Sequence, residues 1–200
     1  MEDDAKLDRL GGWAALAAAL FAVTYTIGFK VLQGQTLGAQ LAAFSLMAGG
    51  LVSAVALFAV YGRLKSIDPS LAMLGVALGF AGVMGAFIHG SFDLANVIHP
   101  EQAGTAGPGP FPVDPRGLLT FGVSGLGLAT LSWVALRATS FPRWLSQLGV
   151  ALGVVLVIVY LSRLIVFDAG SVLVLGPAVV AAVMGIVWYG ALGMKLLGRM

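Results

Sequence analysis

The stretch LAMLGVALGFAGVMGAFIHGSFDLANVI, residues 71–98, is almost entirely apolar until it reaches His89. A transmembrane helix needs about 20 apolar residues, because it must cross about 30 Å of hydrocarbon. The run is continuous rather than alternating, which indicates a helix and not a barrel strand. The tripeptide Asp-Pro-Ser at 68–70 supplies a turn before it. The stretch therefore predicts a membrane-spanning helix whose far end carries His89, Asp93 and Asn96.

The composition extends this conclusion to the whole chain. Of its 200 residues, 59% are hydrophobic and only 10% are charged. A soluble domain usually carries about 25% charged residues, which it needs to cover its surface. The chain therefore belongs to the integral membrane class, with the lipid bilayer as its first partner. The basic residues behind the net charge of +2 are too few and dispersed for a nucleic-acid partner. The absence of cysteine excludes disulfides and thiolate metal sites.

Six apolar runs are long enough to span a bilayer. They lie at about 11–31, 39–62, 71–98, 116–137, 144–167 and 171–195. Only helices and closed barrels satisfy backbone polar groups in lipid. We therefore expect an all-α polytopic membrane protein, with residues 1–200 forming a single domain of six transmembrane helices. Pro177 falls inside the sixth run and is expected to kink that helix.

The basic residues predict the orientation of these helices. If the N-terminus lies inside, eight of the 11 basic residues fall on the inner side and three on the outer side. The inner set is Lys6, Arg9, Arg63, Lys65, Arg137, Arg143, Lys195 and Arg199, and the outer set is Lys30, Arg116 and Arg163. The positive-inside rule then places both termini in the cytoplasm. The acidic start MEDDAKLDR is unlike a secretory signal, so the first run is expected to remain as a membrane helix.

Small residues recur at four-residue spacing and let helix backbones approach closely. Examples are Gly75 with Gly79, Gly149 with Gly153, and Gly49 with Ser53. This pattern predicts a compact bundle, with a homo-oligomer as an option.

The word LGVALG occurs at 74–79 and again at 148–153, each time near the start of an odd-numbered helix. One interpretation is three related hairpins, as in transporters built from parallel repeats. The other interpretation is that the repeat arose by chance, because the sequence consists largely of Leu, Gly, Ala and Val. If the repeat is real, it superimposes His89 on Arg163.

A polar cluster is expected at the outer end of the bundle. At 1.5 Å rise per residue, His89, Arg163 and Lys30 each lie about 28 Å from the start of their helices, at one depth. Asp93 and Asn96 share a helix face with His89, and Tyr160 shares one with Arg163. Because an Asp facing lipid is costly, Asp93 should face the bundle and pair with Arg163. The predicted pocket is His89, Asp93, Asn96, Tyr160 and Arg163. The alternative is that these groups only reach towards lipid headgroups, as expected of Lys30.

The connection HPEQAGTAGPGPFPVDPR, residues 99–116, follows directly above this cluster. It holds five of the eight prolines, which favour stiff, extended backbone. We expect either a lid over the cluster or a passive cover.

Metal chemistry is the next possibility, with His89, Asp93 and His99 as candidate ligands. A His/Asp pair on one helix resembles membrane hydrolases of the alkaline-ceramidase and adiponectin-receptor type. Those enzymes also need His-x3-His on a late helix, and the last three runs contain no histidine. His99 is also too shallow to act as the second ligand of a membrane haem. Phosphate-loop, dinucleotide and serine-hydrolase motifs are absent. The residues therefore favour a non-enzyme without a cofactor.

Two segments of the sequence carry a motif that resembles one in a known family. VDPRGLLTFG at 113–122, followed by FPRWLSQLGVALGVVLVIVYLSRLIV at 141–166, resembles bacterial multi-pass membrane proteins of a domain-of-unknown-function family. In those proteins a similar Pro-Arg-Trp-Leu turn opens the penultimate pair of helices. The resemblance implies a bacterial inner-membrane protein of about six helices and implies no activity.

Two functions of different classes follow. The favoured one is a protein with an outward polar pocket that binds or transports a small solute or ion. The alternative is a non-catalytic accessory or scaffold subunit of a membrane complex. A metal-dependent membrane hydrolase is a minor alternative.

The topology can be tested by cysteine labelling. A cysteine introduced at Gly104, in a chain without any other cysteine, should react with a membrane-impermeant reagent added from outside the cell. Labelling from the cytoplasmic side alone would contradict the predicted orientation.

Overall fold

A computed structural model describes residues 2–100, 114–166, 168 and 170–200, with the side chains of 2–4 excepted. The described chain is a set of helices joined by short turns, and it contains no strand. The elements are α1 (Glu2–Thr26), η1 (Ile27–Val31), α2 (Thr36–Leu64), α3 (Pro69–Ile98), η2 (Pro115–Gly117), η3 (Leu118–Val123), α4 (Ser124–Ala135), α5 (Arg143–Ile165) and α6 (Val172–Leu196).

Within the described residues, six helical segments are long and apolar enough to cross a membrane, which confirms the predicted fold class. The boundaries differ in detail. The first helix begins at Glu2, well before the apolar run, because polar residues outside the membrane can continue a helix. The fourth span begins with the short helices η2 and η3. The sixth is one helix, Val172–Leu196, that continues through Pro177. Pro177 lies in its second turn, so its missing N–H removes a single early hydrogen bond.

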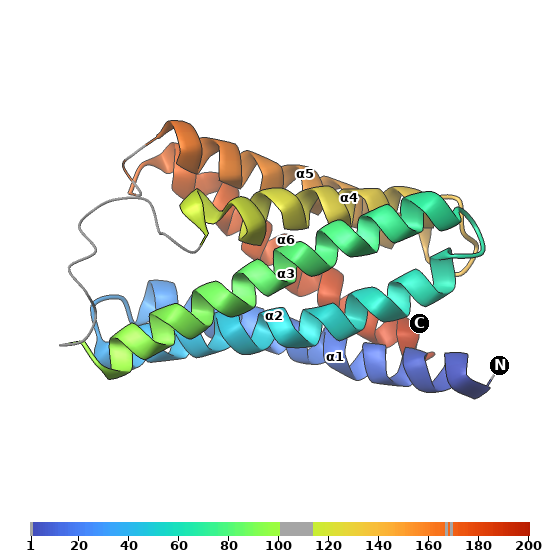
Figure 1. Ribbon diagram of the computed structural model, residues 1–200, viewed down its shortest axis with the longest axis horizontal. Coiled ribbons are helices and arrows are strands. Elements are labelled where there is room, and N and C mark those ends of the chain that lie inside the picture. The colour runs from blue at the N-terminus through green and yellow to red at the C-terminus, as the bar shows by residue number, and fades with distance from the viewer. Residues whose placement is uncertain (1, 101–113, 167, 169) are drawn as a thin grey trace.

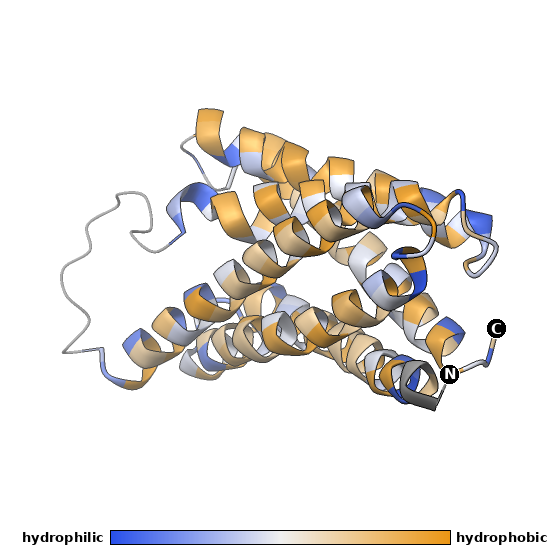
Figure 2. Cartoon of the chain, turned by 45° about the vertical axis from the view of Figure 1, so that its right-hand side comes forward, coloured by the Kyte–Doolittle hydropathy of each residue, from blue (hydrophilic) through white to orange (hydrophobic). Residues whose placement is uncertain are grey.

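The helices form a ring in chain order. Each helix packs against the next, and α6 packs back against α1. Figure 1 shows α1 and α2 on one side of the bundle and α4 and α5 on the other, with α3 and α6 running diagonally between the two sides. Both termini lie at the same end, which we call the terminal end; the opposite one is the distal end. Figure 2 shows hydrophilic residues at both ends and mainly hydrophobic ones along the helices.

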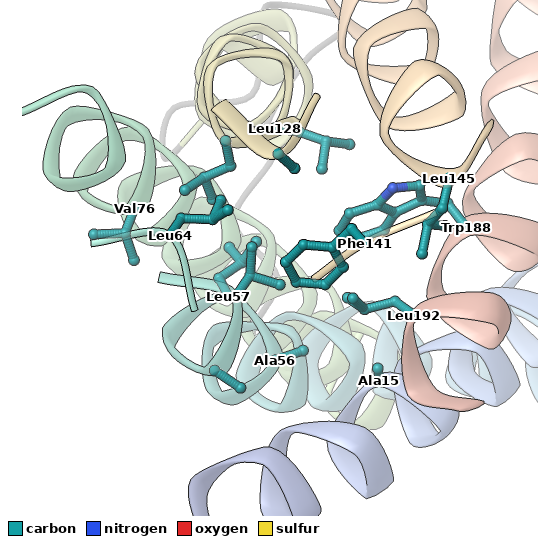
Figure 3. Packing of buried hydrophobic residues seen from close by; sticks show 14 of the residues in the cluster. Ala15, Ala56, Leu57, Leu64, Val76, Leu128, Phe141, Leu145, Trp188 and Leu192 are labelled. Carbon is teal, nitrogen blue, oxygen red and sulfur yellow. The ribbon is translucent and has the colours of Figure 1, made fainter. Parts of the chain in front are cut away.

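The core fills mainly the terminal half of the bundle. Figure 3 shows Leu57, Phe141, Trp188 and Leu192 packed together from α2, the α4–α5 turn and α6. All four side chains are buried. A cavity of about 10 Å³ remains beside them, next to Ser146, and it is large enough for about one water. The middle of the bundle is therefore mainly apolar, and most hydrophilic residues lie at its two ends.

The fourth span is held closely between α3 and α5 by glycines. A Cβ on Gly127 of α4 would lie 2.6 Å from the Cα of Gly79 on α3. On the other side, a Cβ on Gly125 would lie 2.5 Å from the carbonyl oxygen of Gly153 on α5. Neither helix pair can therefore accept a side chain at these positions. The two LGVALG segments, which contain Gly79 and Gly153, pack against the same helix from opposite sides.

The α3 contacts continue along the fourth span in an antiparallel register. From the terminal to the distal end, the facing pairs are Gly75 with Leu131, Gly79 with Gly127, Gly82 with Ser124, Gly85 with Leu119, and His89 with Asp114. The predicted close approach at Gly75, Gly79, Gly149 and Gly153 is therefore realised inside one chain.

This packing yields a stability prediction. Gly127→Ala should lower the free energy of unfolding by about 1–3 kcal/mol, because the added methyl group overpacks the α3–α4 contact. Gly190→Ala on α6 is the matched control, since a Cβ there meets nothing within 4 Å. Thermal unfolding of the detergent-solubilised proteins measures both. Equal stability of the two variants would contradict the close contact.

Candidate functional site

The distal end holds a cluster of ionisable side chains centred on His89 of α3. The Nε2 atom of His89 lies 3.4 Å from Oδ2 of Asp93, one turn further along the same helix. Its Nδ1 atom lies 3.6 Å from Oδ2 of Asp114, which immediately precedes η2. The side chain of Asp114 is fully buried, that of His89 is 13% exposed and that of Asp93 is 39% exposed. The imidazole therefore lies between a buried and a partly exposed carboxylate.

Asp114 caps the beginning of the fourth span. Its Oδ1 accepts a hydrogen bond of 2.8 Å from the N–H of Leu119, and its Oδ2 accepts one of 3.1 Å from the N–H of Thr120. These donors come within reach because the chain turns sharply at Arg116 and Gly117, with φ angles of 59° and 79°. The left-handed conformation is uncommon for a non-glycine residue such as Arg116. The hydrogen bonds to the buried carboxylate help to offset the cost of this turn.

The same contacts determine the charge state of Asp114. Burial alone would raise the pKa of this carboxyl group. The polar side chains of His89 and Thr120 and the backbone N–H groups of Leu119 and Thr120 outweigh burial, and they lower the pKa to about 2. Asp114 is therefore ionised at neutral pH, and it places a fixed negative charge beside His89.

Arg163 of α5 brings a positive charge to the same end. Its guanidinium carbon lies 5.2 Å from the centre of the Phe121 ring, a cation–π distance. It is also within electrostatic range of Asp114 and of Tyr25 on α1. The expected ion pair between Asp93 and Arg163 is not among those formed by the described residues. Asp93 takes His89 as its partner instead, because the two lie four residues apart on one helix.

The other predicted site residues lie at the same end with different surroundings. Tyr160 of α5 is half-buried, and its ring packs against Gly122 of η3. Asn96 is half-buried in the last turns of α3. His99 is exposed at the end of α3. Within the described ranges, no group of three or more His, Cys, Asp or Glu side chains could hold a metal ion, so His99 does not join His89 and Asp93. Most of the predicted lid, residues 101–113, falls outside the described residues.

Sequence reasoning missed two members of the cluster. Asp114 precedes Pro115, and an acidic residue before a proline is a helix-start signal that could have identified it as a cap. Tyr25 is one turn before Phe29, on which its ring stacks with a centroid distance of 5.6 Å. It lies within electrostatic range of both Asp93 and Arg163, at the α1 side of the cluster. An isolated Tyr in an apolar run gives no signal of such a role.

Comparisons with protein-family models, curated proteins and solved structures give no match for this chain.

The capping role of Asp114 predicts a pH-dependent loss of stability. Because its pKa falls from 3.8 to about 2 on folding, its contribution is complete above pH 4 and is lost as the pH falls through 2. Asp114→Asn should therefore unfold about 2 kcal/mol more easily than the wild type at neutral pH, and the difference should shrink towards pH 2. Thermal unfolding in detergent across this range measures it.

Asp93→Asn is the matched control, because its carboxylate is partly exposed and should contribute less than about 1 kcal/mol. A difference between wild type and Asp114→Asn that stays constant from pH 7 to pH 2 would contradict the capping role.

Proposed function

We propose that this membrane protein binds a small solute or ion at the distal cluster. The observation that carries the proposal is Arg163, a half-buried guanidinium that forms no ion pair within the described part of the chain. Cations at this depth usually have a counter-charge, because burying an unpaired charge is costly. Asp114 supplies only a longer-range attraction, since its oxygens are engaged by His89 and by two backbone N–H groups. Arg163 can therefore accept a ligand anion.

The chemistry of the neighbouring groups narrows the ligand class. Arg163 offers a planar fork of donors that suits a carboxylate or a similar oxyanion. Asp93 is 39% exposed and could receive a cationic group from the same solute. Tyr25 interacts electrostatically with both residues, which supports their sharing one region. A small anion or zwitterion satisfies this arrangement better than a bare cation.

Ligand-dependent thermal stability tests the proposal. The purified protein would be unfolded in sulfate, acetate, succinate, glycine and glutamate, each at the same ionic strength. A probe that binds at about 100 times its Kd should raise Tm by roughly 5–10 °C for a protein of this size. The rise should disappear in Arg163→Gln and persist in Lys30→Gln, an exposed cation of the same end. No rise with any probe, or an equal rise in Arg163→Gln, would contradict the site.

A second candidate, an accessory or scaffold subunit, is favoured by a different observation. Asp114 has no exposed surface and is engaged by its own chain, as expected of a group that holds the bundle together. Strong destabilisation by Asp114→Asn combined with a negative ligand screen would support this role.

The proposal includes the membrane and the orientation. We place the protein in a bacterial inner membrane with the terminal end in the cytoplasm. The distribution of basic residues, eight towards the terminal end and three towards the distal end, supports the orientation, and the resemblance of residues 113–122 and 141–166 to bacterial membrane proteins is the reason for the choice of membrane. The distal cluster then opens towards the outside.

A further inference from the structure

A second polar feature lies at the terminal end, far from the distal cluster. A cavity of about 310 Å³ opens between the first turns of α1 and the last residues of the chain. It is lined by Ala5, Arg9, Trp13, Leu196, Leu197 and Arg199. Figure 2 shows both chain ends at this end of the bundle.

The walls of the cavity are held by close helix packing. A Cβ on Gly12 of α1 would lie 2.7 Å from a carbon of Leu197. A Cβ on Gly193 of α6 would lie 2.8 Å from the carbonyl oxygen of Gly12. The helices α1 and α6 are therefore in direct contact next to the cavity.

Two arginines give the cavity its charge. The Arg199 guanidinium lies 5.8 Å from the centre of the Trp13 ring, which orients it. Arg9 lines the same space. Neither arginine forms an ion pair within the described residues. The neighbouring Arg63 is different, because its Nη2 lies 2.6 Å from Oδ2 of Asp8. The cavity therefore presents two positive charges that no described carboxylate neutralises.

The exposed tryptophans place this cavity at the membrane surface. Trp13, Trp133 and Trp144 are 50%, 53% and 46% exposed, and they lie on α1, α4 and α5 towards the terminal end. Exposed tryptophans concentrate at the level of lipid headgroups. Arg9 is one helical turn from Trp13, on the side away from the hydrocarbon. The cavity therefore opens at headgroup level, with Leu196 and Leu197 at its apolar edge.

We propose that this cavity binds the phosphate group of an anionic phospholipid from the adjoining leaflet. Arg9 and Arg199 would donate charge-assisted hydrogen bonds to the phosphate oxygens, which suit the geometry of guanidinium groups. Trp13 and Leu197 would contact the glycerol region. A lipid is favoured over a soluble phosphate compound because the cavity combines two cations with an apolar edge at headgroup depth. This site is independent of the function proposed for the distal cluster.

Native mass spectrometry of the delipidated protein tests the site. The protein would be titrated with phosphatidylglycerol and with phosphatidylcholine of identical acyl chains. The first phosphatidylglycerol should bind about tenfold or more tightly than the first phosphatidylcholine, and Arg9→Gln/Arg199→Gln should lose this preference. Both arginines are exposed, so the variant should keep the Tm of the wild type.

The control is Lys65→Gln/Arg143→Gln, which removes two exposed charges from the same end without touching the cavity. Its preference should stay within about twofold of the wild type. Equal losses in the two double variants would overturn the site, because general surface charge would then explain the binding. Inorganic phosphate is the second probe. If inorganic phosphate displaces the first phosphatidylglycerol as effectively as added lipid does, the proposal of a lipid ligand is overturned, because a soluble phosphate compound would then suffice.

Discussion

The close contact between α3 and the fourth span is the constraint on which the distal end depends. Where Gly127 meets Gly79, the backbone of α3 leaves no room for a side chain on α4. The antiparallel register established there continues to the end of the span and brings Asp114 beside His89. Because lipid offers no hydrophobic drive between helices, such contacts rely on van der Waals packing over small residues. The geometry of the polar cluster is therefore determined by glycines in the middle of the membrane.

Two charged side chains of the cluster, Asp114 and Arg163, have different surroundings within the described residues. Asp114 is buried, yet two backbone N–H groups and the His89 imidazole stabilise its negative form. The free N–H groups at a helix start also favour a negative charge. Arg163 has an aromatic ring and a more distant carboxylate as its surroundings. Among the described residues, Asp114 is thus stabilised by hydrogen bonds, whereas Arg163 has no ion pair to offset the cost of its partial burial.

Hydropathy alone predicted the six spans, since a continuous apolar run in lipid has only the helix available to it. The Gly75 and Gly79 spacing also indicated correctly that backbones approach closely, although it could not say which helix would be the partner. Whether Asp93 pairs with His89 or with Arg163 depends on how α3 and α5 are rotated about their own axes. His89 and Asp93 share one helix, so their contact needs only the helical repeat, while a contact with Arg163 needs the relative rotation of two helices. Asp114 was missed because its donors become available only after the left-handed turn at Arg116 and Gly117.

The ring of helices is completed by a contact between the first and the last. This contact spans most of the sequence, so it can form only after α6 has been synthesised and inserted. His89, Asp114 and Arg163 all belong to segments that leave the ribosome earlier. During synthesis the distal cluster can therefore assemble while Gly12 of α1, which contacts α6 in the folded protein, still faces lipid. The contacts of the terminal end therefore form last, and the cavity between Arg9 and Arg199 requires α6 to be in place beside α1.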